Sequence, residues 1–117
     1  MPERFSNKEF LTTVAEYFKV LAETSRLQII SCLQSGAMNV TEIGEATGLG
    51  QANLSKHLKL LTQTGILARK PQGVSVYYEV SDPLTLELCR LVSDRIYKQM
   101  QARAKQFKKM NSFSSKS

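Results

Sequence analysis

The chain has 117 residues, of which 42% are hydrophobic and 22% charged, and its formal net charge is +6 at pH 7. This length and composition predict one globular domain, and no stretch approaches the ~18 apolar residues of a transmembrane helix. The first ten residues, MPERFSNKEF, contain no apolar signal-peptide core, so we expect a cytoplasmic protein with no membrane partner. The excess of Lys and Arg suits a polyanionic partner, although basic charge alone does not identify one.

Two helices are predicted in the first third of the chain. Ser6 starts the S-x-x-E pattern of a capping box, and apolar residues follow at helical spacing from Phe10 onward. These aromatic and apolar side chains either fill the core or form a dimer seam. A break at residues 22–25 separates this helix from a second one, which begins near Arg26 and ends at Gly36.

The central stretch, VTEIGEATGLGQANLSKHLKLLT over residues 40–62, has the pattern of a helix-turn-helix. Asn39 and Glu42 predict a capping box at the start of a short helix, and Gly48 is expected to end it. Residues 51–64 form the second helix, with leucines at i, i+4 and i+7 on one face and polar side chains opposite. In such a motif the second helix enters the major groove of DNA, and its first turn meets the base edges.

A β-hairpin is predicted directly after this helix. Residues 66–70 and 74–80 are the expected strands, and Pro71-Gln72-Gly73 between them is a turn signal. A basic hairpin in this place is a wing, which can reach the neighbouring minor groove or the DNA backbone. The expected DNA-binding residues of the helix and the wing are Gln51, Ala52, Ser55, Lys56, His57, Lys59, Lys70, Gln72 and Ser75.

Residue chemistry suggests a role for several of these side chains. The amide of Gln51 suits adenine, the methyl group of Ala52 can contact thymine, and Lys56 can reach guanine or a phosphate. Lys59 is better placed for a phosphate. His57 lies at the edge of the buried face, where we expect a packing or phosphate-contacting histidine rather than a metal ligand.

A last helix begins at Pro83, after Ser81 and Asp82, and keeps an apolar stripe for about five turns. The chain becomes strongly basic after Asp94, and the Ser-rich end, residues 111–117, is expected to be a disordered tail. The elements together predict an α+β fold that is mainly α, a winged helix-turn-helix. It comprises four helices, a two-stranded β-hairpin wing and a C-terminal helix, in a single domain of residues 1–110.

Three segments carry a resemblance to a known family. FKVLAETSRLQIISCL, then VTEIGEATGLGQANLSKHLKLLTQTGIL, then KPQGVSVYYEVSD resemble the ArsR/SmtB family of bacterial winged-helix repressors, over roughly residues 14 to 98. The resemblance implies a homodimer, formed by the first and last helices, that binds an inverted repeat in its own promoter. It also implies release from the operator when an inducer binds, most often a metal ion.

Physical reasoning agrees with the implied dimer. Two half-sites about one helical turn apart require two recognition helices that are held by a two-fold seam. The first and last helices have apolar surface to supply this seam. The expected dimer-interface residues are Phe10, Val14, Tyr17, Leu84, Leu88 and Leu91.

The metal sites of the family are not retained. The family's zinc-binding positions are occupied here by Asp82, Leu84, Arg95 and Lys98, and the thiolate site by Asn39-Val40-Thr41. We therefore expect no metal and no cofactor. Cys32 and Cys89 lie on the helices that carry sensor thiols in some relatives, although their registers are shifted. They are possible sensor residues for oxidants, sulfide or a soft metal, or else small buried hydrophobic side chains.

Two other classes of function were weighed. An enzyme is not expected, because no nucleophile–base pair, paired-carboxylate or phosphate-loop pattern is visible and the chain has one histidine. A winged-helix module that binds proteins instead of DNA is the other alternative, and the basic face of the recognition helix argues against it. The favoured hypothesis is a dimeric, sequence-specific transcriptional regulator that binds a double-stranded DNA operator, with the inducer unknown.

Overall fold

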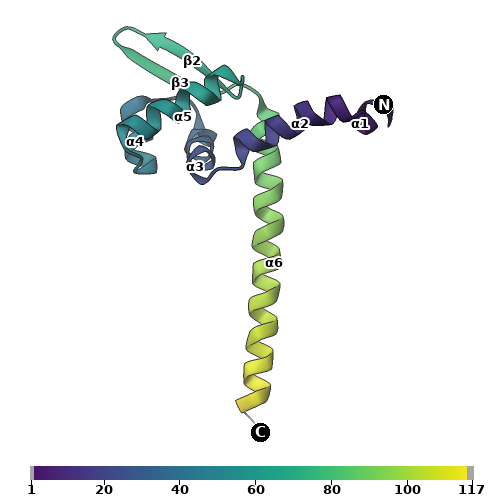
Figure 1. The fold of residues 1–117 in the computed structure, drawn as a ribbon. Coiled ribbons are helices and arrows are strands. Elements are labelled where there is room, and N and C mark those ends of the chain that lie inside the picture. The colour runs from purple at the N-terminus through teal and green to yellow at the C-terminus, as the bar shows by residue number, and fades with distance from the viewer. Residues whose placement is uncertain (1, 116–117) are drawn as a thin grey trace. The chain divides into compact units, whose positions relative to one another are not determined.

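The computed structural model describes residues 2–115 of the chain. The chain divides into two compact units, Met1–Pro83 and Leu84–Ser117. The helices are α1 (Pro2–Ser6), α2 (Lys8–Leu21), α3 (Thr24–Cys32) with a following 3-10 turn η1 (Leu33–Ser35), α4 (Val40–Thr47), α5 (Gln51–Gln63) and α6 (Pro83–Ser115). The strands are β1 (Met38–Asn39), β2 (Leu67–Gln72) and β3 (Ser75–Val80) (Figure 1).

The first two long helices begin at other residues than the sequence patterns predict. Ser6 ends α1, and Asn7 is the N-cap of α2, because its side-chain oxygen accepts a hydrogen bond of 3.0 Å from the backbone N–H of Phe10. The carboxylate of Glu23 caps α3 in the same way, at 2.9 Å from the backbone nitrogen of Arg26. Glutamate is not one of the residues preferred as an N-cap, so the sequence pattern did not reveal this cap. Helix α3 therefore begins at Thr24, earlier than the predicted start near Arg26.

Helix α4 begins and ends as predicted, whereas α5 begins at Gln51 as predicted but ends at Gln63, one residue before the predicted end, with Thr64 as its C-cap. The side chain of Asn39 accepts from the backbone nitrogen of Glu42 at 2.8 Å, and Glu42 accepts from the backbone nitrogen of Asn39 at 2.9 Å. This is the complete capping box. Gly48 ends α4 in the left-handed conformation, with φ 72°. The chain can therefore turn sharply between α4 and α5.

The sheet has three strands in the order β1-β3-β2, so the predicted two-stranded hairpin was incomplete. The strand that the sequence does not reveal is β1, in which Asn39 lies opposite Tyr77 on β3. The turn of the hairpin also comes later than predicted. Because Gln72 lies opposite Ser75, only Gly73 and Val74 form the loop, and Pro71 belongs to β2.

The core of the first unit lies between α3, α4, α5 and the base of the hairpin. Figure 1 shows these three helices gathered together, with the hairpin projecting beyond them. The buried side chains of this core are aliphatic: Ile29, Ile30, Leu33, Ile43, Leu54, Leu58, Leu61, Ile66 and Leu67. Burying them is the main stabilising contribution, because each such side chain contributes about 1.5–3 kcal/mol.

The second unit is described by itself. Helix α6 begins at Pro83, as predicted, and continues to Ser115, so residues 111–115 are helical where a disordered tail was expected. The last two residues of that tail lie outside the described part of the chain. No helix in the described range is long and apolar enough to span a membrane.

Candidate nucleic-acid interface

Helix α5 has one buried face and one exposed face. Leu54, Leu58 and Leu61 are 0–3% exposed and hold the helix against the core. A Cβ atom built on Gly44 would lie 3.6 Å from Leu54, so α4 and α5 approach each other closely at this point. The orientation of α5 is therefore set by its apolar face, and the residues opposite it are left to meet a ligand.

The exposed face contains most of the predicted contact residues. Five of the six predicted on this helix are exposed: Gln51, Ala52, Ser55, Lys56 and Lys59. The structure adds Asn53, which is exposed in the first turn and whose amide has the donor and acceptor needed to recognise adenine. Its residue type and first-turn position were visible in the sequence. It was missed because it lies on the flank of the polar face.

The first turn of α5 has no side-chain cap. The N-cap residue is Gly50, which has no side chain, and no side-chain hydrogen bond caps this end. The first backbone N–H groups of a helix have no partner within the helix, and together with the helix dipole they favour a negatively charged group. A DNA phosphate beside the first turn would accept hydrogen bonds from these N–H groups and would interact favourably with the helix dipole.

His57 does not lie on the exposed face of α5 with the other residues predicted to contact DNA. Its side chain is 12% exposed, and its Nε2 atom lies 3.9 Å from a carboxylate oxygen of Glu23 at the start of α3. The Nδ1 atom is buried and has no hydrogen-bond partner among the described residues. The histidine therefore lies between α5 and the N-terminus of α3, in a packing position.

The wing is less basic than the sequence suggests. Lys70 on β2 forms an ion pair with Glu79 on the neighbouring strand β3, so its charge is compensated. Gln72 is exposed near the tip and Ser75 is half-buried, while Val74 at the tip is fully exposed. The tip can contact a groove, but we expect it to contribute little net positive charge.

The predicted dimer residues are apolar surface on this single chain. On α2, Phe10 is 44% exposed, while Val14 and Tyr17 are half-buried. On α6, Leu84 and Leu91 are 57% and 64% exposed, and Leu88 is half-buried. Large apolar side chains that are exposed at regular spacing mark a contact surface.

The two cysteine thiols are in environments that favour the neutral form. Burial raises the pKa of the Cys32 thiol, whose Sγ donates a hydrogen bond of 3.1 Å to the backbone oxygen of Ile29. Burial also raises the pKa of the Cys89 thiol. The thiolate is the reactive and metal-binding form, so neither thiol is activated. Among residues 2–115, no three His, Cys, Asp or Glu side chains lie together as metal ligands would.

Comparisons with known proteins give consistent matches. A family model described as "Bacterial regulatory protein, arsR family" matches residues 23–69. The chain is 30% identical to a probable mercury resistance operon repressor of Streptomyces lividans, over 68% of this chain and 63% of that protein, which is less than two thirds of its length. It is 32% identical to the HTH-type transcriptional regulator NmtR of Mycobacterium tuberculosis, over 72% of this chain and 68% of that protein.

A solved structure agrees with these sequence matches. The solution structure of the homodimeric winged helix-turn-helix DNA-binding domain Mb0332 from Mycobacterium bovis superposes with a TM-score of 0.71 at 29% identity. The superposition covers 79% of this chain and 85% of that domain. The winged helix-turn-helix prediction is confirmed.

Proposed function

The chain belongs to the arsR family of bacterial regulatory proteins, and from this premise we propose that it is a transcriptional repressor that binds an operator in DNA as a homodimer. The observation that carries the proposal is the exposed polar face of α5, backed by three buried leucines. A helix held in this way presents its first turn to base edges and its later turns to phosphates. The proposed ligand is chromosomal DNA, so the proposed place of action is the cytoplasm.

Recognition of the operator would combine base contacts with backbone contacts. The amides of Gln51 and Asn53 can each form two hydrogen bonds with adenine, and Lys56 can donate to guanine. Ser55 can donate to a base or to a phosphate. Lys59 lies further along the same exposed face and would contact a phosphate.

Dimerisation would supply the second recognition helix. The related Mb0332 domain is homodimeric, and the exposed apolar residues of α2 and α6 support the same assembly here. One recognition helix covers a half-site of only a few base pairs. Two helices related by a two-fold axis cover an inverted repeat, which raises both affinity and specificity.

The signal that would release this repressor is not a metal ion at either of the family's usual sites. Leu84, Arg95 and Lys98 occupy positions where the zinc site needs ligands, and a leucine or a cation cannot replace them. The alternative of a thiol sensor has less support, because the environments of Cys32 and Cys89 raise their pKa values. We propose no catalytic role, in line with a family of regulators.

The test of this proposal begins with purified protein and sheared genomic DNA of the source organism. Recovery of one or a few fragments that share an inverted repeat is expected, and recovery of no enriched sequence would overturn the proposal. Lys56→Ala should then weaken operator binding by about 1–3 kcal/mol, if Lys56 contacts a base. Lys59→Ala should reduce the salt slope of binding by about one unit for each protomer, or about two for the dimer.

A matched control separates these effects from a general loss of charge. Lys8→Ala removes the same charge from an exposed position on α2 and should leave operator binding unchanged. If the Lys56 and Lys59 variants bind the operator as the wild type does, the exposed face of α5 is not the DNA-binding surface.

A further inference from the structure

The positive charge of the chain is concentrated at one end. Residues 1–94 contain nine Lys and Arg and all ten Asp and Glu, a net charge of −1. Residues 95–117 contain seven Lys and Arg and no acid, a net charge of +7. The winged-helix unit therefore has no excess of positive charge, although DNA binding normally draws much of its free energy from neutralised phosphates.

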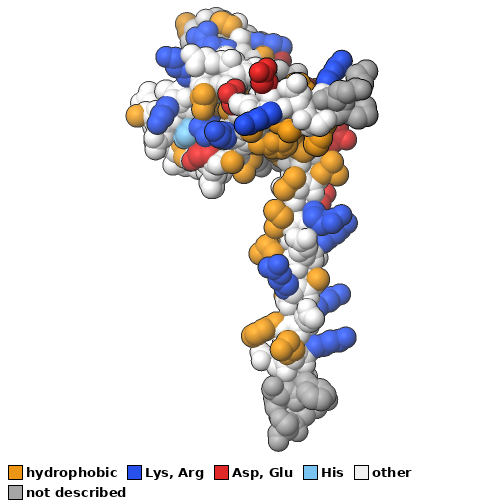
Figure 2. Space-filling model, turned by 45° about the vertical axis from the view of Figure 1, so that its right-hand side comes forward, with side chains coloured by type: hydrophobic (Ala, Val, Ile, Leu, Met, Phe, Trp, Pro, Cys, Tyr) orange, Lys and Arg blue, Asp and Glu red, His pale blue; other side chains and the backbone are white. Residues whose placement is uncertain are grey.

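The part of α6 at residues 95–112, here called the distal basic segment, is exposed along its whole length. Lys98, Lys105 and Lys109 follow one another at spacings of seven and four residues, which places them on one side of the helix. Ile96 and Phe107, which are 50% and 65% exposed, lie on the other side. Figure 2 shows this separation along α6, with orange side chains mainly on one edge and most blue ones on the other.

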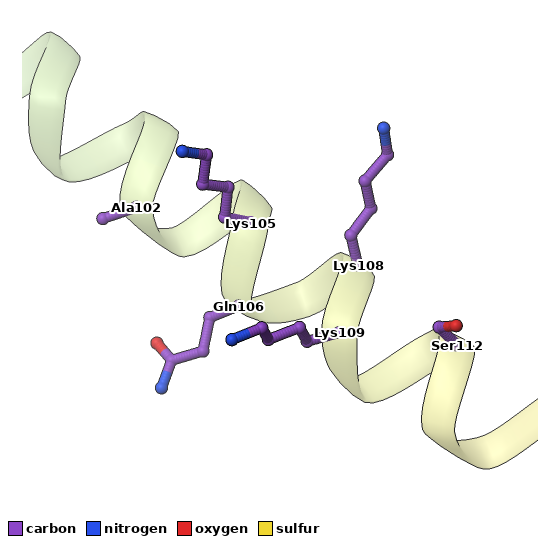
Figure 3. Close-up of a pocket in the computed structure, with 6 residues that line it drawn as sticks. All are labelled: Ala102, Lys105, Gln106, Lys108, Lys109 and Ser112. Carbon is purple, nitrogen blue, oxygen red and sulfur yellow. The ribbon is translucent and has the colours of Figure 1, made fainter.

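The cations of the distal basic segment have no acidic neighbours within the segment. Asp94 is the last acid of the chain, so Lys98 is the only cation of the segment that has an acidic side chain four residues before it on the helix. In Figure 3 the side chains of Lys105, Lys108 and Lys109 extend from α6, around a hollow whose lining residues all belong to this helix. Like charges this close disfavour the helix, so a polyanion bound to them would stabilise it.

We propose that the distal basic segment binds the phosphate backbone of the same DNA molecule that α5 recognises. This inference rests on the proposed function. Once α5 holds DNA, contacts from another segment of the same chain that reaches this DNA are intramolecular, so weak charge contacts become significant. They would supply the sequence-independent binding that residues 1–94, with a net charge of −1, lack.

An anionic membrane and an acidic protein are the competing partners, and the segment fits them less well. A helix that lies in a membrane interface buries a continuous apolar face. Here Arg103 lies on the apolar side, between Met100 and Phe107. An acidic protein would have no source of high effective concentration comparable with operator-bound DNA.

The salt dependence of DNA binding tests the inference. The triple variant Lys105→Gln/Lys108→Gln/Lys109→Gln removes three charges from exposed helical positions and keeps residues that favour a helix. The probe is a labelled duplex of mixed sequence, about 30 base pairs long, which is enough for two half-sites with flanks. Its affinity is measured by fluorescence anisotropy across a salt series.

The expected result is a plot of log K against log salt that is shallower by about 2.7 for each protomer that loses three phosphate contacts, or about 5.4 for the dimer if both protomers contact the duplex. Between 50 and 200 mM salt, the affinity of the wild type should fall about 40-fold further than that of the variant for each contributing protomer. The ratio of operator affinity to mixed-sequence affinity should not change, because no base contact is removed. The control Arg4→Gln/Lys8→Gln/Lys19→Gln loses the same charge from α1 and α2 and should keep the wild-type slope.

Several outcomes would overturn the inference. The first is a salt slope that does not change in the distal triple variant, and the second is an equal loss of slope in the control variant. The third is tighter binding of the wild type to phosphatidylserine vesicles or to polyglutamate than to DNA at equal salt. The inference and the proposed function fail separately. If genomic selection yields no operator but the slope still falls, only the proposed function is rejected.

Discussion

Replacing Gly44 with alanine should stabilise this protein, although Gly44 lies where α4 faces Leu54 of α5. The Cβ atom of an alanine at this position would be 3.6 Å from Cδ2 of Leu54, an ordinary van der Waals distance. Gly44 is not among the glycines that have positive φ. A glycine inside a helix costs about 0.8–1 kcal/mol relative to alanine, so Gly44→Ala should raise the free energy of unfolding by nearly that amount.

The same substitution four residues later should have the opposite effect. Gly48 has φ 72°, in the left-handed region, and a Cβ atom built on it meets nothing within 4 Å. The cost of Gly48→Ala is therefore backbone strain without any clash, and is about 1–2 kcal/mol. The pair of variants separates backbone conformation from packing, because the added methyl group is identical.

The assay is urea unfolding, followed by far-ultraviolet circular dichroism at one fixed protomer concentration, since a dimer is stabilised by mass action. The midpoint urea concentration of the Gly44→Ala variant should rise, its melting temperature in a parallel thermal scan should rise by about 4 °C, and its operator affinity should not change. A loss of stability in Gly44→Ala, or a clear loss of operator affinity, would show that α4 and α5 need the glycine for their approach. Either result would refute the reasoning.

Three further predictions concern assembly and titration. Leu88→Glu should give monomers in sedimentation velocity, because the seam would bury a carboxylate, and a persistent tight dimer would contradict the proposed interface. Cys32 and Cys89 should react with iodoacetamide more slowly than a free thiol at neutral pH, because their raised pKa values reduce the thiolate fraction; rapid labelling in mass spectrometry would contradict this. The pKa of Glu23 is lowered, chiefly by the hydrogen bond from the backbone nitrogen of Arg26, so its stabilising effect is present at neutral pH and is lost as the pH falls below about 4.5. The free energy of unfolding of Glu23→Gln should therefore be lower than that of the wild type at pH 7, and this difference should disappear in acid. A difference that does not depend on pH would show that Glu23 stabilises the protein by packing and not by its charge.

Local patterns in the sequence were sufficient for the helix-turn-helix. The capping box of Asn39 and Glu42, the stop at Gly48 and the start at Pro83 all depend on residues at most four positions apart. The buried face of α5 follows from the helical spacing of its leucines. These features are predictable because neighbours along a helix are also neighbours in space.

The tertiary structure decided the features that depend on residues far apart in the chain. Strand β1 has two residues, too few for an alternating pattern, and it exists because β3 pairs with it. His57 lies beside Glu23, which is 34 positions earlier in the sequence, so the pattern of α5 alone could not show this contact. The ion pair between Lys70 and Glu79 depends in the same way on the register of the hairpin. Periodicity shows which face of an element is apolar, whereas the partners of its charged side chains are set by the register and packing of other elements.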